Sequence, residues 1–498
     1  MHPAKFWHLF LILLLAAFGA EMVYLATLDP SLWGDEFYCV LETALPWRGV
    51  LHGDPGNPPL YPLMLKLVVT LFGGEPWKMK LLSGVPLILA AACGARFLRR
   101  EFSVRAAILF VLCLAATWLP AHYAIEVRAY GWAFFFVLMT ALSAWSVGKN
   151  GRRRDWAQFL FFAVCAAFTH YYALLTCAWG YLLLLGYVAK YDRRQIRAAL
   201  LTAAGAALAF GWYVPIAVEG ASSSSIVMLP PFDFQTVIGY MRSIFAVGEY
   251  AETLQTLNVG GILSLLDGNI AATALLAAMF GAVLFRQIRR SENTGGGGGF
   301  PGAGLATYGL VVATGLSALW LIRPIITNRY LFPAVGLLWL FFAIAGANLT
   351  RRSPRLFAGL CGVLLLFGAL TFTAQARYEN VKGEQFFASV GYLTDEIANG
   401  GGTVFLVTQG ATHKPGWWVL QIYIRGDFIM AKDARKWTPE AVDVWKGKPA
   451  WILANPGEKL AVPPTAAIEF CRSVNLDLHD HDLYHTPDAA AVLPYLRD

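Results

Sequence analysis

The sequence predicts a polytopic α-helical membrane protein with about eleven transmembrane helices and a C-terminal α/β domain. Of its 498 residues, 57% are hydrophobic and only 14% are charged, whereas about 25% of the residues in a soluble protein are charged. Apolar stretches long enough to cross a bilayer recur along the chain, and this pattern ends near residue 375. These observations predict a transmembrane module over residues 1–375 and a separate soluble domain over residues 376–498.

Eleven apolar segments are long enough to cross, or nearly cross, the hydrocarbon core. They lie at residues 6–28, 79–98, 104–121, 131–148, 156–171, 173–190, 198–218, 268–286, 303–322, 330–349 and 355–374. The first of them lacks a small-residue cleavage site and leads into further spans, so we predict a transmembrane helix there and not a signal peptide.

Basic clusters between the apolar segments predict the orientation of the chain, because Lys and Arg gather in cytoplasmic loops. The clusters are Arg96/Arg99/Arg100/Arg105, Lys149/Arg152/Arg153/Arg154, Lys190/Arg193/Arg194/Arg197, Arg286/Arg289/Arg290 and Arg351/Arg352/Arg355. All five share one side only if residues 59–73 do not cross the membrane, so we predict an interfacial or re-entrant helix there. Residues 29–78, 122–130, 172, 219–267 and 323–329 then face the extracytoplasmic side, together with the C-terminal domain.

The net charge of +7 comes mostly from these loop clusters. It is therefore an orientation signal, and the absence of a basic stripe interleaved with aromatic residues argues against nucleic-acid binding. The Ser- and Pro-rich residues 219–232 open a loop over 219–267 that we expect to be flexible and that could close over a site as a lid. The Gly-rich residues 291–304 predict a linker, because no GK[ST] sequence follows them to make a phosphate loop.

The C-terminal region mixes short apolar runs with polar residues. The runs at 403–408, 450–455 and 467–471 predict strands, and residues 384–398 predict an amphipathic helix. The region therefore predicts a small extracytoplasmic α/β domain.

An adjacent acidic pair, Asp35 and Glu36, follows the first predicted span. Charge close to lipid is costly to maintain, so it points to function unless the two carboxylates are simply solvated in a loop. On any regular backbone the two side chains point in different directions, so one could act as a base while the other is structural.

Further polar residues lie in the other predicted outer loops. Glu126 and Arg128 could form a surface ion pair, and His170 with Tyr171 could anchor the membrane interface. Arg323 and Arg329 oppose the positive-inside trend, and arginine matches the geometry of phosphate. Together these loops suit an enzyme whose substrate carries a phosphate at the depth of the lipid headgroups.

Several stretches resemble family 39 of the GT-C glycosyltransferases, which includes protein O-mannosyltransferases and aminoarabinose transferases of lipid A. The similar stretches are WGDEFYCV, the NPPLYPLMLKLVVTLFGGEPWKMKLLSGVPLIL region, AIEVRAYG, THYYALL and NRYLFPAVGLLWL. The resemblance covers roughly residues 6–350 and implies a GT-C membrane fold.

The resemblance also implies roles for individual residues. Asp35 matches the family's presumed catalytic base, with Glu36 and Glu126 as supporting acids, and Lys80, Arg128, Arg329 and Tyr330 would bind the donor phosphate. Asn57 stands where many members have the His of His-Pro-Pro, so this chain departs from the family pattern at that position. The candidate substrate contacts are Asn57, Tyr61, Tyr130, His170 and Tyr171.

The predicted function is sugar transfer from a polyprenyl-phosphate donor to an extracytoplasmic acceptor, by inverting displacement at a bacterial inner membrane. The acceptor could be a glycolipid such as lipid A, a glycan or a protein. Fixed cations could hold the leaving phosphate without a cofactor, but Asp35, Glu36 and Glu126 could bind a divalent cation, so metal use stays open. The alternatives are a transporter or flippase for a lipid-linked sugar, although we find no internal repeat, and a scaffold whose C-terminal domain binds a partner.

Overall fold

The chain forms two units. The computed structural model describes residues 3–32, 34–52, 57–223, 306–314, 328–400, 446–454, 467–476 and 479–492, and short stretches at 244, 278, 281–282, 302–303, 404–407, 427–430, 457 and 460. The helical unit comprises Met1–Thr27 and Cys39–Tyr378, and the C-terminal unit comprises Leu28–Tyr38 and Glu379–Asp498. Two helices, α2 and α19, contain residues of both units.

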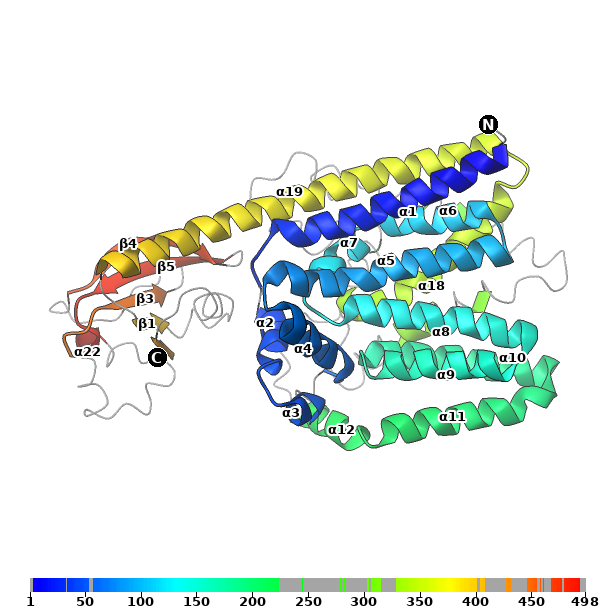
Figure 1. Ribbon diagram of the computed structural model, residues 1–498, viewed down its shortest axis with the longest axis horizontal. Helices are drawn as coiled ribbons and strands as arrows, with labels where there is room; N and C mark the ends of the chain where they lie inside the picture. The colour runs from blue at the N-terminus through cyan, green and yellow to red at the C-terminus, as the bar shows by residue number, and fades with distance from the viewer. Residues whose placement is uncertain are drawn as a thin grey trace. The chain divides into compact units, whose positions relative to one another are not determined.

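The described part of the helical unit consists of helices (Figure 1). They are α1 (Pro3–Leu28), α2 (Gly34–Glu42), α3 (Trp47–His52), α4 (Leu60–Phe72), α5 (Pro76–Glu101), α6 (Val104–Ala116), α7 (Trp118–Ile125), α8 (Tyr130–Asn150), α9 (Arg153–Ala167), α10 (Tyr171–Tyr191), α11 (Ile196–Gly211), α12 (Val214–Ser223), α18 (Asn328–Leu349) and α19 (Pro354–Gly400), with a 3-10 turn at Arg193–Gln195.

Six of the described helices are long and apolar enough to cross a membrane, and a bent pair makes up to seven. Large apolar side chains point outward on several helices: Ile12, Leu208 and Leu366 are 61%, 81% and 59% exposed. Such exposure is expected where lipid and not water surrounds the helix. Helices α9 and α11 occupy two further predicted spans, with 15 and 16 residues. The total of eleven spans stays a prediction.

The bent pair is α6 and α7, which lie in one predicted span, 104–121, but are related by a bend of 65°. Thr117 breaks the helix with an extended backbone, φ −111° and ψ 140°. The break places Pro120 in the first turn of α7, where its missing N–H leaves no hydrogen bond unmade. The sequence pattern missed the bend because both halves are equally apolar.

The short helix α4 lies where we predicted a segment that does not cross the membrane. Its 13 residues span about 20 Å, less than the roughly 30 Å of hydrocarbon in a bilayer. Lys66 Nζ on this helix donates to the carbonyl oxygens of Thr43 and Leu45, both at 2.7 Å. The lysine thereby satisfies carbonyl groups just beyond the end of α2.

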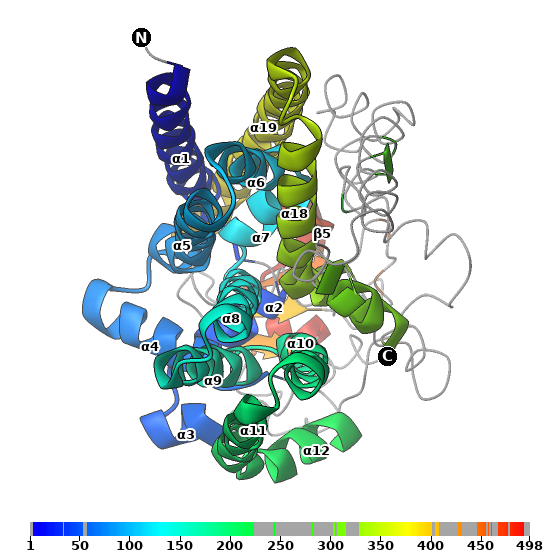
Figure 2. The same cartoon turned by 90° about the vertical axis from the view of Figure 1, so that its right-hand side faces the viewer.

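Helix α8 lies at the centre of the described bundle, in contact with α5, α9, α10 and α18 (Figure 2). Its buried Phe134 stacks on Phe332 of α18 with 5.0 Å between ring centroids. A Cβ atom at Gly336 would lie 2.9 Å from the Phe134 ring, so glycine is needed there for close packing of the helices.

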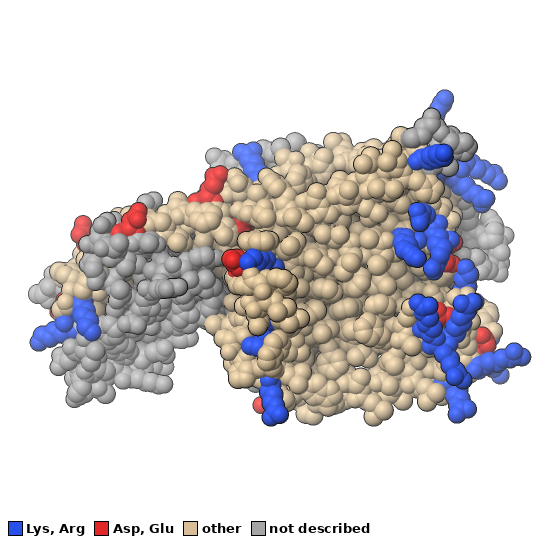
Figure 3. Space-filling model, viewed as in Figure 1, with Lys and Arg blue, Asp and Glu red and all other residues tan. Residues whose placement is uncertain are grey.

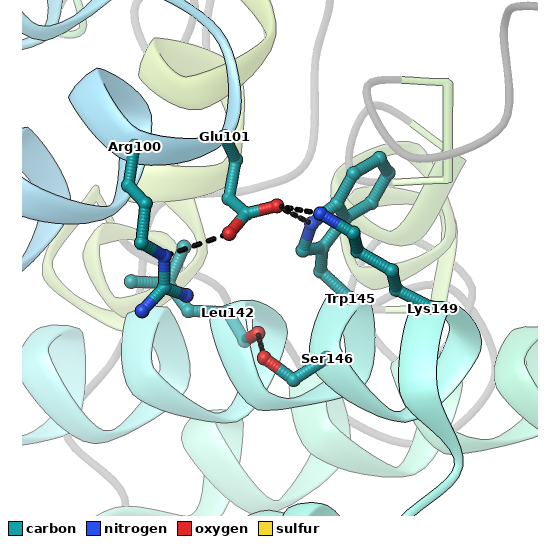
Figure 4. Close-up of polar contacts among 6 residues, drawn as sticks. All are labelled: Arg100, Glu101, Leu142, Trp145, Ser146 and Lys149. Carbon is teal, nitrogen blue, oxygen red and sulfur yellow. Dashed lines mark hydrogen bonds and ion pairs between the residues drawn. The ribbon is translucent and has the colours of Figure 1, made fainter.

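Four of the five basic clusters lie at one end of the helical unit, which we call the basic end (Figure 3). There Glu101 of α5 accepts hydrogen bonds from Lys149 Nζ at 2.7 Å and Trp145 Nε1 at 3.2 Å, both on α8, and from Arg100 Nε at 2.7 Å (Figure 4). Arg105 Nη1 donates to the carbonyl oxygen of Thr350 at 2.6 Å, which links the start of α6 to the end of α18. The fifth cluster, 286–290, lies outside the described residues.

The C-terminal unit contains a five-stranded mixed sheet in the order β2-β1-β3-β5-β4. The strands are β1 (Val404–Val407), β2 (Asp427–Met430), β3 (Ala450–Ala454), β4 (Glu469–Leu476) and β5 (His479–Thr486), and a short helix α22 (Ala489–Val492) follows. Strand β1 pairs in parallel with β2 and β3, while β5 pairs antiparallel with β3 and β4. This confirms the predicted small α/β domain and adds two strands, β2 and β5, that the sequence pattern missed.

Helix α19 replaces two predicted elements, the span 355–374 and the helix 384–398, with one continuous helix. No proline or turn sequence separates the two predicted elements, so the helix has no reason to stop between them. The predicted spans at 268–286 and 303–322, the linker at 291–304 and the loop at 219–267 lie mostly outside the described residues. Residues 219–223 of that loop, at its start, belong to α12.

Candidate functional site

The loops at the other end of the helical unit hold most of the predicted site residues, and we call this the site end. A tight turn at residues 126–129 connects α7 to α8, closed by a 2.7 Å hydrogen bond from the amide of Arg128 to the carbonyl oxygen of Glu126. The turn lies against α5: Ser83 Oγ is 2.8 Å from Tyr61 Oη and donates to the Arg128 carbonyl oxygen at 3.3 Å. A Cβ atom at Gly131 would lie 2.4 Å from the Ser83 carbonyl oxygen, so only glycine permits this approach.

The guanidinium of Arg128 connects three parts of the site end. It donates to Cys39 Sγ at 3.4 Å and to Asn57 Oδ1 at 3.5 Å. The same group lies 5.8 Å from the centroid of the Tyr130 ring. A small cavity lies among these side chains, lined by Cys39, Asn57, Pro58, Tyr61, Pro62, Arg128, Ala129, Tyr130 and His170. Four predicted substrate contacts, Asn57, Tyr61, Tyr130 and His170, therefore meet at Arg128.

His170 lies at the centre of an aromatic cluster. Its ring centroid is 5.5 Å from that of Tyr130 and 5.6 Å from that of Tyr330. Tyr172 stacks on Tyr330 at 5.4 Å, and the Arg329 guanidinium lies 5.4 Å from the Tyr330 ring. The start of α18 is thus held against the start of α10, and Arg329 comes to the same cluster as Arg128.

The environment of His170 disfavours a charged imidazole. Burial, reinforced by the positive charges of Arg128 and Arg329, lowers the pKa of His170 to about 3. The ring is therefore neutral at physiological pH, and its Nδ1 accepts a hydrogen bond from the Tyr172 amide at 3.1 Å. Two arginines that lie about two hundred residues apart in the sequence thus act on one half-buried ring.

The sequence suggested an ion pair between Glu126 and Arg128, but the carboxylate of Glu126 lies beside His122. Its Oε1 lies 3.0 Å from Nε2 of His122, one helical turn earlier, and both side chains are nearly buried. Its Oε2 is buried with no hydrogen-bond donor among the described residues, and the same holds for the hydroxyl of Tyr130. Buried polar atoms of this kind are costly unless a ligand or water satisfies them.

The remaining predicted residues lie as follows. Lys80 is buried in α5, three residues before Ser83, so the two share a helix face. Tyr171 begins α10, but its neighbour Tyr172 makes the stack on Tyr330. Asp35 and Glu36 form the first turn of α2 and belong to the C-terminal unit, where Glu36 is buried and Asp35 half-buried.

Sequence reasoning missed Cys39, Ser83, Tyr172 and Tyr213. Tyr213 Oη donates to the Asn57 carbonyl oxygen at 3.1 Å, across 156 positions of sequence. Among these four residues, only Ser83 could have been predicted from the sequence, because it lies one helical turn after the candidate Lys80. Among the residues that the structure describes, no group of three or more His, Cys, Asp or Glu side chains is arranged to hold a metal ion.

Comparisons with known proteins agree on the fold. No protein-family model matches the sequence, and no curated protein sequence matches it. The structure is similar to that of ArnT from Cupriavidus metallidurans, both bound to undecaprenyl phosphate (TM-score 0.56, 15% identity) and in the apo state (TM-score 0.58, 14% identity). Each comparison covers 95% of this chain and 97% of the ArnT chain. The chain therefore has the GT-C fold that the sequence resemblance implied.

Proposed function

We propose that this chain is a membrane glycosyltransferase that moves a sugar from a polyprenyl-phosphate donor to an extracytoplasmic hydroxyl acceptor. The observation that carries the proposal is the convergence of Arg128 and Arg329 on one aromatic cluster at the site end. The planar guanidinium group presents N–H donors that match the oxygens of a phosphate, so two arginines at one cluster suit a phosphate ligand. ArnT, which has the same fold, was solved with undecaprenyl phosphate bound.

The donor would place its phosphate at the site end and its isoprenoid tail in the bilayer. Arg128, Arg329 and Lys80 would stabilise the charge that develops on the phosphate as it leaves. Tyr330, against which Arg329 lies, would fix the orientation of that guanidinium. The buried Tyr130 hydroxyl and Glu126 Oε2 are then available to polar groups of the sugar.

Asp35 would act as the general base in a single displacement. It takes the proton of the acceptor hydroxyl while that oxygen bonds to the anomeric carbon and the bond from that carbon to the phosphate oxygen breaks. The phosphate leaves with the electron pair, and the anomeric configuration inverts. Asp35 lies in the first turn of α2.

The sugar would be a hexose or a pentose, and a glycolipid, a glycan or a protein would accept it. We place the protein in a bacterial inner membrane with the site end on the periplasmic side. We do not propose the alternative of a transporter or flippase, because the clearest charged residue within a described span, Glu21, lies in the last third of α1 and not at its middle. Transport sites lie near the bilayer midplane.

The test is sugar transfer by the purified protein from a radiolabelled polyprenyl-phosphate sugar, with envelope glycolipids as acceptor. Asp35→Asn keeps the shape of the side chain but removes the base, so we expect a loss of at least 100-fold in kcat. Asp395→Asn, at an exposed position of α19, is the matched control and should transfer at the wild-type rate. Turnover by Asp35→Asn near the wild-type rate would exclude Asp35 as the base.

A further inference from the structure

A buried turn precedes the helix that carries Asp35. Asp29 Oδ1 accepts a hydrogen bond from the amide of Ser31 at 2.8 Å, and Oδ2 accepts one from the Ser31 hydroxyl at 2.8 Å. Asp29 and Ser31 are 1% and 0% exposed. The aspartate therefore closes an Asx-turn around Pro30 and fixes the backbone at the end of α1.

The charge of this aspartate is balanced from α19. Lys382 Nζ lies 3.0 Å from Asp29 Oδ2, and the side chains of Lys382 and Asp29 are 10% and 0% exposed. Lys382 belongs to the buried face of α19 together with Glu379, Phe386 and Ser389, at helical spacing. A buried ion pair of this kind often adds little to the free energy of unfolding. It does define geometry, because separating the two side chains would leave each charge buried without an opposite charge beside it.

Gly383, the next residue of α19, allows the backbone of the helix to lie close to the backbone of the turn at residues 28–29. A Cβ atom at Gly383 would lie 2.6 Å from the Leu28 carbonyl oxygen and 3.5 Å from Asp29 Cα. Both of these atoms belong to the backbone and cannot rotate away. Glycine at position 383 is therefore required for the turn to lie directly on the helix, where Lys382 reaches Asp29.

We propose that Lys382 and Gly383 are positioning residues that hold the segment Leu28–Tyr38 on α19 and thereby set the place of Asp35. Only Leu32, Trp33 and Gly34 separate the fixed turn from Asp35, and Leu32 is itself buried. A shift of the turn is therefore passed to the start of α2. This inference rests on the proposed function, because a displacement of about 1 Å in a general base can reduce turnover by about 100-fold.

The first experiment compares two Gly→Ala variants of α19. Gly383→Ala should lower kcat for sugar transfer at least tenfold, with the KM for the polyprenyl-phosphate sugar changed less than twofold. Gly391→Ala is the control, because a Cβ atom there meets nothing within 4 Å, and it should retain the wild-type kcat. Hydrogen exchange of the peptide covering residues 28–32 should be faster in Gly383→Ala alone.

The second experiment keeps the glycine and changes the lysine. Lys382→Met removes the charge at nearly constant length and should reproduce the loss in kcat, whereas Lys382→Arg retains the charge and should restore most of it. A purely structural role for Lys382 would instead reduce the amount of folded protein and leave the kcat of the folded fraction unchanged.

The outcomes separate this inference from the proposed function. If the wild-type protein transfers sugar and both Gly383→Ala and Lys382→Met retain its kcat, the positioning role is wrong. If no form of the protein transfers sugar, the proposed function fails. In that case the exchange measurement still decides whether Gly383 anchors residues 28–32, because it does not depend on activity.

Discussion

At the scale of single residues, the site end is defined by where its two arginines lie. Arg128 lies in a tight turn that Gly131 allows to approach α5, and Arg329 lies in the first turn of α18 against Tyr330. Burial, reinforced by the positive charges of both arginines, lowers the pKa of His170 to about 3.

Removal of one of these arginines should weaken the binding of a lipid phosphate. We expect Arg329→Ala to raise the Kd for a short-chain polyprenyl phosphate by about 10- to 100-fold, since a hydrogen bond to a charged group contributes about 1.5–3 kcal/mol. Titration of the purified protein, followed by intrinsic fluorescence, measures this Kd. Arg153→Ala, an exposed arginine at the basic end, serves as the control. An unchanged Kd for Arg329→Ala would assign the phosphate to other residues.

Several residues that the sequence singled out lie together at the site end, and their roles there stay predictions. Asn57, Tyr61, Tyr130 and His170 were expected at the site, and all four line one small cavity. The choice between Tyr171 and Tyr172 depends on the rotation of α10 about its axis. That rotation follows from the N-cap hydrogen bond at His170, which no apolar pattern reveals.

At the scale of elements, apolar periodicity located most of the described helices, because lipid demands long apolar segments. It failed at the bend between α6 and α7, where Pro120 and Thr117 decide the geometry. It also failed at β5, whose sequence HDHDLYHT is largely polar. Strand β5 is ordered by pairing with β3 and β4 on both sides, and this is a tertiary effect.

The close packing of α8 on α5 can be tested through two glycines. Gly131→Ala would place a methyl group 2.4 Å from the Ser83 carbonyl oxygen, and overpacking of this kind costs about 1–3 kcal/mol. We expect a lower melting temperature in detergent and a loss of transfer activity. In α10, Gly180 has nothing within 4 Å of its Cβ position, so Gly180→Ala should leave the melting temperature equal or higher. Equal melting temperatures for Gly131→Ala and the wild type would contradict the packing described.

At the scale of the whole molecule, the helical unit has two chemically different ends. One end carries four described basic clusters, joined by contacts such as those of Glu101 and Arg105. The other carries the aromatic cluster and the two arginines. The positive-inside rule predicts that the basic end faces the cytoplasm, which leaves the site end for substrates of the cell envelope.

The measurement that tests this account most directly is the sidedness of the two ends in intact cells. Single-cysteine variants Arg48→Cys, on α3 at the site end, and Arg194→Cys, at the basic end, replace exposed arginines on a background without the native cysteines. A maleimide that cannot cross the membrane should label Arg48→Cys in intact cells and Arg194→Cys only after permeabilisation. Labelling of Arg194→Cys in intact cells, with Arg48→Cys protected, would place the site in the cytoplasm and contradict the account.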